Sequence, residues 1–168
     1  LVVTENRGLA GAYDSTVLKY TQNLIQEKHA SKDQYVIIVT GKVGLNFFEK
    51  RGYPVILSKT DIPDDLSFDD ALGFAKQILT MFDTKKFDEL HLIYNHFVNA
   101  ISQTLVDKQL LPLKDLESEP AAKVNYVYEP DEDEVLETLL PLYAEGQIYG
   151  ALLDAKAAEQ AARMSAIR

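Results

Sequence analysis

The sequence predicts an α/β fold, in which a three-layer domain with a mostly parallel sheet is followed by one long C-terminal helix. Two observations predict it. In the first half of the chain, short β-branched runs alternate with segments whose apolar residues have helical spacing. Strands and helices that alternate over short connections form parallel sheets with right-handed crossovers. In the last third, helical spacing continues to the end of the chain. We therefore expect a globular domain over 1–130 and a long helix over 131–168.

Apolar patterns define the expected elements of the first half. Residues 36–39 are a continuous β-branched run, which is typical of a strand buried on both faces. Residues 68–82 carry one apolar stripe at helical spacing, which is typical of a helix packed on a sheet. In chain order we expect a strand at 1–4, a tight loop at 8–11, a helix at 12–29, a strand at 36–39, a helix at 43–50, a strand at 55–57, a helix at 68–82 and a strand beginning at 90–94.

The pattern changes after Tyr94. Residues 97–113 show no helical spacing, and we expect a continued or antiparallel strand that ends near Pro112. A polar loop over 114–123 and a last strand over 124–128 should follow. The expected fold is therefore a Rossmann-like domain whose mostly parallel sheet has one antiparallel edge region.

The long helix has a well-marked start. Pro130 and Asp131 stand where a helix begins, and the carboxylates of 132–134 would lie at its positive end. Over 131–168 the helix would span roughly 57 Å, whereas the preceding domain would be only about 36 Å across. We therefore expect the helix to project beyond the domain. We also expect a kink at Pro141, which has no N–H to donate.

The end of this helix is rich in alanine. Residues 151–168 contain seven Ala, and such small side chains let another helix approach closely. Because an isolated Ala-rich helix has little hydrophobic driving force, we expect this stretch to need a partner. The chain begins with Leu1 inside an expected strand and ends within the helical pattern, so we expect a fragment at both ends.

Composition excludes several classes of function. The chain has 168 residues, of which 46% are hydrophobic, and no apolar run is long enough to cross a membrane. With no cysteine, the chain has neither disulfides nor thiolate metal sites. The net charge is -9, and residues 115–145 hold ten acids and one base. Nucleic-acid binding is disfavoured because phosphate contacts need clustered Lys and Arg. The acidic stretch is either a solvated face with helix capping or a docking surface for a basic partner.

Candidate catalytic groups are few. The Gly8–Gly11 loop follows a strand and precedes a helix, where dinucleotide-binding folds hold phosphate. It has neither the G-x-G-x-x-G pattern nor the Lys-Ser/Thr of a P-loop, so a tight turn is the simpler interpretation. His91 and His96 should point to opposite faces of their strand, and His29 ends a helix, so we expect no histidine metal site. No catalytic constellation and no cofactor site emerge.

Several segments, in order along the whole chain, match a known protein family. They are GLAG with Tyr13-Asp14-Ser15, Gly41-Lys42 with Phe47-Phe48, Tyr94-Asn95-His96-Phe97, Leu110-Leu111-Pro112, Tyr128-Glu129-Pro130 and Glu159-Gln160-Ala161-Ala162-Arg163-Met164. The pair Tyr-Glu-Pro and Glu-x-x-x-Arg-Met, at this separation around one expected helix, is specific. Together these segments resemble the gamma subunit of the F-type rotary ATP synthase.

The resemblance implies a function. In that family the gamma subunit is the central rotor shaft, which couples proton translocation to ATP synthesis and has no catalytic site of its own. Two long helices form an antiparallel coiled coil inside a ring of alpha and beta subunits, and the globular domain lies beside epsilon and the c ring. This chain would be the globular domain and the first part of the C-terminal shaft helix. No cofactor, nucleic acid or membrane span is implied.

The resemblance also implies the contact residues. Glu159, Arg163 and Met164 would lie where the shaft faces the beta subunits, whereas Tyr126, Tyr128, Glu129 and Tyr149 would face epsilon and the c ring. Independently, Glu159 and Arg163 are four residues apart, which favours an intrahelical ion pair.

The sequence departs from the usual family pattern in a few places. Ala10, Ala158 and Ile167 replace the residues that are usual there, which are Cys, often Ser, and Met. The Cys-bearing insertion of chloroplast gamma subunits is absent, which favours a bacterial type. We therefore expect a peripheral position on the cytoplasmic face of the cell membrane.

Two alternatives stay open at this point. The first is a flavodoxin-like or dinucleotide-binding α/β enzyme that uses the Gly8–Gly11 loop. The second is an unrelated interaction module that binds a partner through the long helix.

Overall fold

A computed structural model describes residues 1–5, 13–28, 31–63, 65–99, 102–112 and 132–167. The elements are β1 (Val2–Val3), α1 (Tyr13–Lys28), η1 (Lys32–Gln34), β2 (Ile37–Thr40), α2 (Lys42–Lys50), β3 (Val55–Lys59), α3 (Phe68–Asp83), β4 (Leu90–Asn99), β5 (Ser102–Leu111) and α4 (Glu132–Ile167). Each agrees with an expected element except η1, a short 3-10 helix that was not predicted. The expected loop at 8–11, the polar loop at 114–123 and the strand at 124–128 lie outside the described residues.

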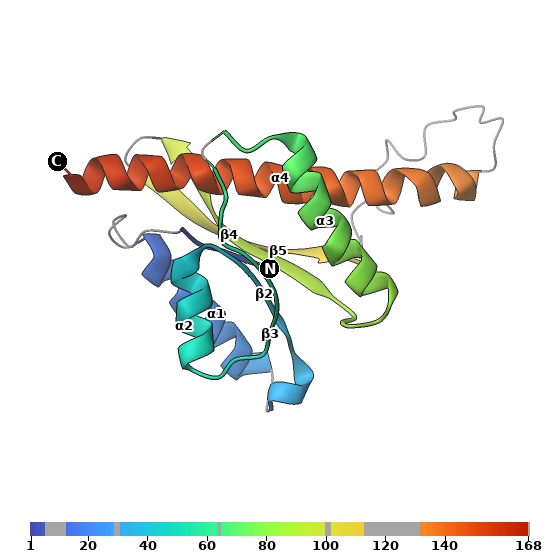
Figure 1. Cartoon of the computed structure of the whole chain (residues 1–168), viewed down its shortest axis with the longest axis horizontal. Coiled ribbons are helices and arrows are strands. Elements are labelled where there is room, and N and C mark those ends of the chain that lie inside the picture. The colour runs from blue at the N-terminus through green and yellow to red at the C-terminus, as the bar shows by residue number, and fades with distance from the viewer. Residues whose placement is uncertain (6–12, 29–30, 64, 100–101, 113–131, 168) are drawn as a thin grey trace.

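The five strands form one sheet in the order β3-β2-β1-β4-β5. β1 pairs in parallel with both β2 and β4, and β2 pairs in parallel with β3. Among the described strands only β5 is antiparallel: it pairs with β4 along nearly its whole length. Helices α1 and α2 cover one face of the sheet, and α3 and α4 cover the other (Figure 1). The predicted three-layer α/β fold with one antiparallel edge region is confirmed.

The central strand β1 is buried on both faces because its neighbouring side chains point in opposite directions. Val3 packs in the cluster formed with α3 and α4. Val2 packs in the cluster formed with α1 and α2. This double burial explains why the strands read as continuous apolar runs in the sequence.

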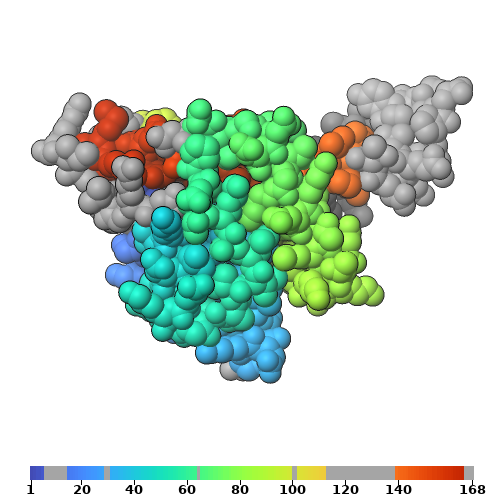
Figure 2. Space-filling view, viewed as in Figure 1, coloured from blue at the N-terminus to red at the C-terminus, as the bar shows by residue number. Residues whose placement is uncertain are grey.

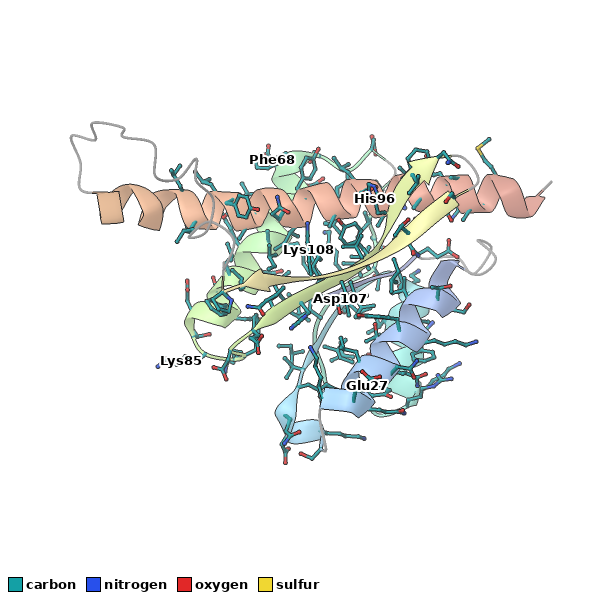
Figure 3. The ribbon with its side chains drawn as sticks, turned by 180° about the vertical axis from the view of Figure 1, so that it is seen from behind. Glu27, Phe68, Lys85, His96, Asp107 and Lys108 are labelled. Atoms are coloured by element: carbon teal, nitrogen blue, oxygen red, sulfur yellow. The ribbon has the colours of Figure 1, made fainter. Side chains whose placement is uncertain are left out.

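The same alternation gives β5 two sets of contacts. Figure 3 shows Asp107 and Lys108 pointing to opposite sides of the sheet. The Tyr20 hydroxyl on α1 donates to Asp107 at 2.5 Å, and the ammonium group of Lys108 donates to Gln147 of α4 at 2.8 Å. The antiparallel edge strand is therefore tied to a helix on each face.

Helix α4 crosses the whole molecule and extends past the sheet at both ends (Figure 1), as expected from its length. It continues through Pro141, and the expected kink is not visible in the plane of Figure 1. Figure 2 shows part of α3 and the segment before it in front of the middle of α4. The long helix therefore lies against the domain over much of its length.

Some alanines of α4 pack against this chain's own domain and not against a second helix. Ala151, Ala155 and Ala158 are buried, the first two in the same core as β4 and α3. Their small side chains let the helix axis come close to the chain's own sheet. The expectation that this stretch needs a partner to hold it is therefore wrong for the face that carries these alanines, although other residues of the stretch stay exposed.

A first prediction concerns Gly41, which precedes α2. Its φ is +92°, and an added Cβ would lie 2.3 Å from the carbonyl oxygen of Thr4. We expect Gly41→Ala to lower the free energy of unfolding by about 3 kcal/mol. Gly73→Ala is the control, because nothing lies within 4 Å there and the residue is in a helix. It should stabilise by about 1 kcal/mol in the same urea titration. Equal midpoints for the two variants would contradict the close approach.

A second prediction concerns Tyr20. Its hydrogen bond to Asp107, together with burial and the charges of Asp107 and Glu27, raises the pKa of the Tyr20 phenol from 10.0 to about 12. We expect Tyr20→Phe to lower the free energy of unfolding by about 1 kcal/mol at pH 7. Because the folded-state pKa is the higher one, this stabilisation is complete below pH 10 and is lost as the pH rises towards 12. Urea titrations of both proteins at pH 7 and 11 would test it. If the difference in free energy of unfolding between the two proteins is as large at pH 11 as at pH 7, the stabilising role of the Tyr20–Asp107 hydrogen bond is contradicted.

Candidate functional site

Helix α4 has two faces of different character. The inner face lies on the domain, and the outer face is exposed. The buried residues of the inner face are Ala144, Glu145, Ile148, Ala151, Leu152, Ala155, Ala158, Glu159 and Ala161. The outer face carries a stripe of exposed residues: Leu142, Gly146, Gly150, Leu153, Ala157, Gln160 and Met164. These are separated by alternating steps of three and four residues after Gly146, which is the spacing of a coiled-coil seam. We call these seven residues the outer stripe.

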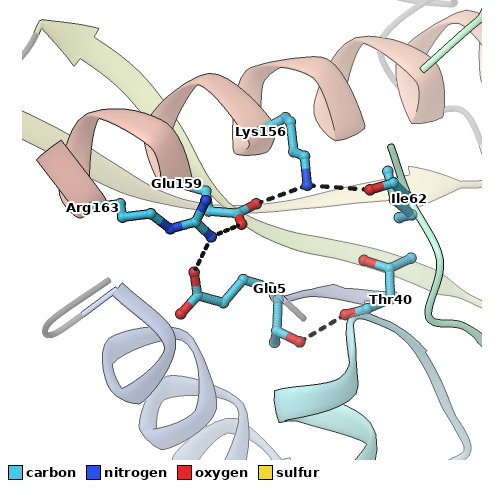
Figure 4. A network of polar contacts seen from close by, with 7 residues as sticks. Glu5, Thr40, Ile62, Lys156, Glu159 and Arg163 are labelled. Atoms are coloured by element: carbon cyan, nitrogen blue, oxygen red, sulfur yellow. Dashed lines mark hydrogen bonds and ion pairs between the residues drawn. The ribbon is translucent and has the colours of Figure 1, made fainter. Parts of the chain in front are cut away.

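Charged residues gather where the inner face of α4 meets the sheet (Figure 4). The Arg163 guanidinium donates to Glu159 at 2.6 Å and to Glu5 at 3.4 Å. The Lys156 ammonium lies 3.3 Å from Glu159 and donates to the carbonyl oxygen of Ile62 at 3.2 Å. We call Glu5, Lys156, Glu159 and Arg163 the polar cluster. It joins α4 to β1 and to the segment between β3 and α3.

The backbone around Glu5 is held by α2. The carbonyl oxygen of Glu5 accepts from the Val43 N–H at 3.0 Å. The Thr4 hydroxyl donates to the carbonyl oxygen of Thr40 at 2.7 Å and accepts from the Gly44 N–H at 2.9 Å. Because these contacts fix the end of β1, the carboxylate of Glu5 has a set position beneath α4.

The polar cluster is charge-balanced and well shielded from solvent. The side chain of Glu5 is 0% exposed and that of Arg163 is 23% exposed. Two carboxylates face two cations, so neither buried acid stands without an opposite charge. A buried ion pair adds little net stability, but removing one partner leaves a costly buried charge. Such a cluster favours one specific packing of α4 over others.

The cluster lies at the place where doubly wound folds bind ligands. In such sheets a ligand occupies the crevice at the carboxyl ends of the strands, where the strand order reverses. Here that point is the carboxyl end of β1, between β2 and β4. The side chains of Glu159 and Arg163 lie above it, and the cavity that Glu159 lines there has a volume of about 10 Å³. Among the described residues this point therefore has no room for a dinucleotide, and the Gly8–Gly11 loop of that alternative lies outside them.

A larger cavity of about 390 Å³ lies elsewhere, lined by Leu1, Ile37 and Leu90 among others. These residues stand at the amino ends of their strands. Ligands of this fold class bind at the opposite ends.

A second polar contact holds the same helix farther from its end. The Asp154 carboxylate accepts from the backbone N–H of Phe97 at 2.7 Å and also pairs with the ring of His96. His91 pairs instead with Asp107, whose carboxylate also binds Tyr20 of α1. The two histidines therefore lie on opposite faces of the sheet, as expected, and the described residues contain no cluster of metal ligands.

The structure separates the residues that were predicted to face the beta subunits. Glu159 is buried and its predicted ion pair with Arg163 is confirmed. Both lie on the inner face. Met164, which is 63% exposed, lies on the outer stripe. Tyr149 packs edge-on against Phe68 of α3, with ring centroids 5.2 Å apart. Tyr126, Tyr128 and Glu129 lie outside the described residues.

Glu5, Lys156 and Asp154 were not predicted from the sequence. Arg163 lies 158 residues from Glu5 along the chain, and nothing local signals such a pairing. One usable signal existed: Glu5 is an acid directly after a strand that is buried on both faces.

A third prediction concerns the polar cluster. Arg163→Ala would leave the buried Glu5 and Glu159 carboxylates short of one cation. We expect it to lower the free energy of unfolding by about 2 kcal/mol, less than for a fully buried pair because Arg163 is part exposed. Met164→Ala, one residue away on the exposed face, should change it by less than about 0.5 kcal/mol. Equal losses in urea titrations would show that the cluster contributes nothing specific.

Comparison with known proteins gives a consistent result. The family described as ATP synthase has a model that matches residues 1–168. A curated ATP synthase gamma chain from Brevibacillus brevis is 48% identical over 167 residues. That match covers 99% of this chain and 58% of the relative, so the chain spans somewhat more than half the length of that protein.

Solved structures show the same fold. The central stalk and c-ring structure of the Tetrahymena thermophila mitochondrial ATP synthase matches with a TM-score of 0.78 and 28% identity, over 98% of this chain and 72% of that one. A rotor structure of the Euglena gracilis mitochondrial ATP synthase matches with a TM-score of 0.71 and 21% identity, over 98% of this chain and 63% of that one. Sequence and fold agree: the chain belongs to the ATP synthase gamma-chain family.

Proposed function

We propose that this chain is the globular domain and lower shaft of a central-stalk rotor subunit. It couples proton translocation through the membrane sector to ATP synthesis and hydrolysis in a ring of alpha and beta subunits. Membership of the gamma-chain family supports the proposal, as does the likeness to a central stalk and c-ring structure at 28% identity.

The main support for the proposal is that helix α4 has apolar residues on its exposed face as well as on its buried face. A helix used only inside a domain buries its apolar face and exposes a polar one. On α4 the outer stripe is also apolar or small except at Gln160, and it exposes the large side chains of Leu142, Leu153 and Met164. Gly146 and Gly150 within the stripe would allow the axis of a second helix to come close. The stripe therefore suits the partner helix of an antiparallel coiled-coil shaft.

We place the catalytic chemistry in the neighbouring subunits, with this chain as the mechanical coupler. The shaft end of α4 would face the beta subunits. There Met164 and the part-exposed Arg163 are available for contact, whereas Glu159 would act through Arg163. The domain would face epsilon and the c ring through Tyr126, Tyr128, Glu129 and Tyr149.

The position in the cell follows from the same proposal. No described helix is long and apolar enough to cross a membrane. We place the chain peripherally at the cytoplasmic face of a bacterial cell membrane, as part of the ATP synthase. The bacterial origin of the 48% identical gamma chain supports this.

A fourth prediction tests the function with a chimera. The aligned part of the Brevibacillus brevis gamma chain is replaced by this chain and expressed with that organism's remaining ATP synthase subunits. We expect the complex to assemble and to pump protons into vesicles when ATP is added. A folded chimera that does not assemble would contradict the proposal.

A matched pair of variants tests the outer stripe in the same chimera. Leu153 on α4 and Ile56 on the edge strand β3 are 39% and 37% exposed. Leu153→Asp would bury a carboxylate in the helix–helix seam, so we expect at least a tenfold loss of assembled complex. Ile56→Asp should assemble like the unmodified chimera. Equal assembly of the two variants would count against a seam on this face.

A further inference from the structure

We propose that Glu5 is a positioning residue that, through Arg163, fixes the register of α4 on the sheet, so that helix and domain turn as one body. This inference rests on the proposed rotor function. It also names the part of the domain through which force on α4 would pass. That part is the carboxyl end of the central strand β1.

Apolar packing specifies this register unevenly along α4. Ile148 and Leu152 are large buried side chains that hold the middle of the helix. Nearer Arg163 the buried apolar residues are small: Ala155, Ala158 and Ala161 follow one another at intervals of about one helical turn. Contacts between such similar side chains discriminate poorly between settings that differ by one turn, about 5.4 Å. At this end of the helix a contact of a different kind must make the choice.

The polar cluster supplies that discrimination. Arg163 Nη2 lies 3.4 Å from Glu5 Oε2, and a shift of one turn would separate the two groups. It would leave the Glu5 carboxylate, whose side chain is 0% exposed, without the guanidinium. Removing one partner of a buried charge is strongly unfavourable, so the shifted setting is disfavoured. Buried polar groups have this role of fixing register in coiled coils.

The attachment point suits the transfer of force. Glu5 lies two residues after the central strand β1, which pairs with strands on both sides, and the carbonyl oxygen of Glu5 accepts from the first turn of α2. Lys156 reaches the carbonyl oxygen of Ile62, in the segment between β3 and α3. A displacement of α4 is thus resisted by the centre of the sheet and by the connection to its far edge.

Glu5 is a clean probe of this role. Because its side chain is fully buried, it cannot touch another subunit. Any effect of changing it on the rotor must therefore pass through its contacts within this chain. Arg163 is less suitable, since its part-exposed guanidinium could also contact a neighbouring subunit.

Hydrogen exchange on the chain itself is the first test. We expect the amides of 156–164 to exchange about tenfold faster in Glu5→Met and less so in Glu5→Gln, which keeps an oxygen acceptor. The amides of 144–152, held by apolar packing, should keep their rates. The control is Glu89→Gln, at an exposed carboxylate near His91. Unchanged exchange at 156–164 in Glu5→Met would overturn the proposal, whether or not the chain is a rotor.

The chimeric ATP synthase gives the second test. Glu5→Met should lower the number of protons pumped per ATP hydrolysed by at least twofold, and Glu5→Gln should retain more of it. A merely structural loss would reduce the amount of complex and leave this ratio unchanged. An unchanged ratio in Glu5→Met would overturn the positioning role. Failure of the unmodified chimera to pump would count against the proposed function, while the exchange result would still decide the register proposal.

Discussion

The contact between α4 and the carboxyl end of β1 determines how this domain is used. In an α/β sheet of this order, that end is the position at which a ligand would bind. Here the chain fills it with Glu159 and Arg163 from its own last helix, and the Arg163 guanidinium pairs with both Glu159 and Glu5. That end of the sheet thereby becomes a fixed attachment for a helix that extends beyond the sheet. Such an attachment would suit the proposed transmission of force along α4.

The division of α4 into two faces follows from that attachment. Once Arg163 is held by Glu5, Ala151, Ala155 and Ala158 must face the sheet, and Leu153 and Met164 must face away. The outer stripe is thus presented in one orientation relative to the domain. In a coiled coil, the orientation of one helix about its axis determines which residues of the second helix it contacts. The polar cluster and the outer stripe are therefore two parts of one arrangement.

Much of the fold could be predicted from the sequence because its signals are local. The β-branched run that became β2 and the apolar stripe of α3 each lie within one element, so their period is visible directly. The Glu159–Arg163 pair was predictable for the same reason, since the two residues are four apart on one helix. The matching segments along the chain identified the family.

The remaining features depend on tertiary contacts that leave no local pattern. Glu5 reads as an ordinary acid after a strand, and only the packing of α4 on β1 reveals its partner. The alanines of 151–168 were expected to let a second helix approach. Small residues permit close approach to any surface, and the sequence does not say which surface that is. Several are buried against the chain's own sheet.

The structure of the chimeric complex, determined with the shaft in place, would test the central claim most directly. The account predicts that Arg163 remains in hydrogen-bond contact with Glu5 and that a second helix covers the outer stripe from Gly146 to Met164. It would be contradicted by a helix α4 that is turned about its axis, with Ala151, Ala155 and Ala158 packed on another helix or subunit and the Glu5 carboxylate parted from Arg163.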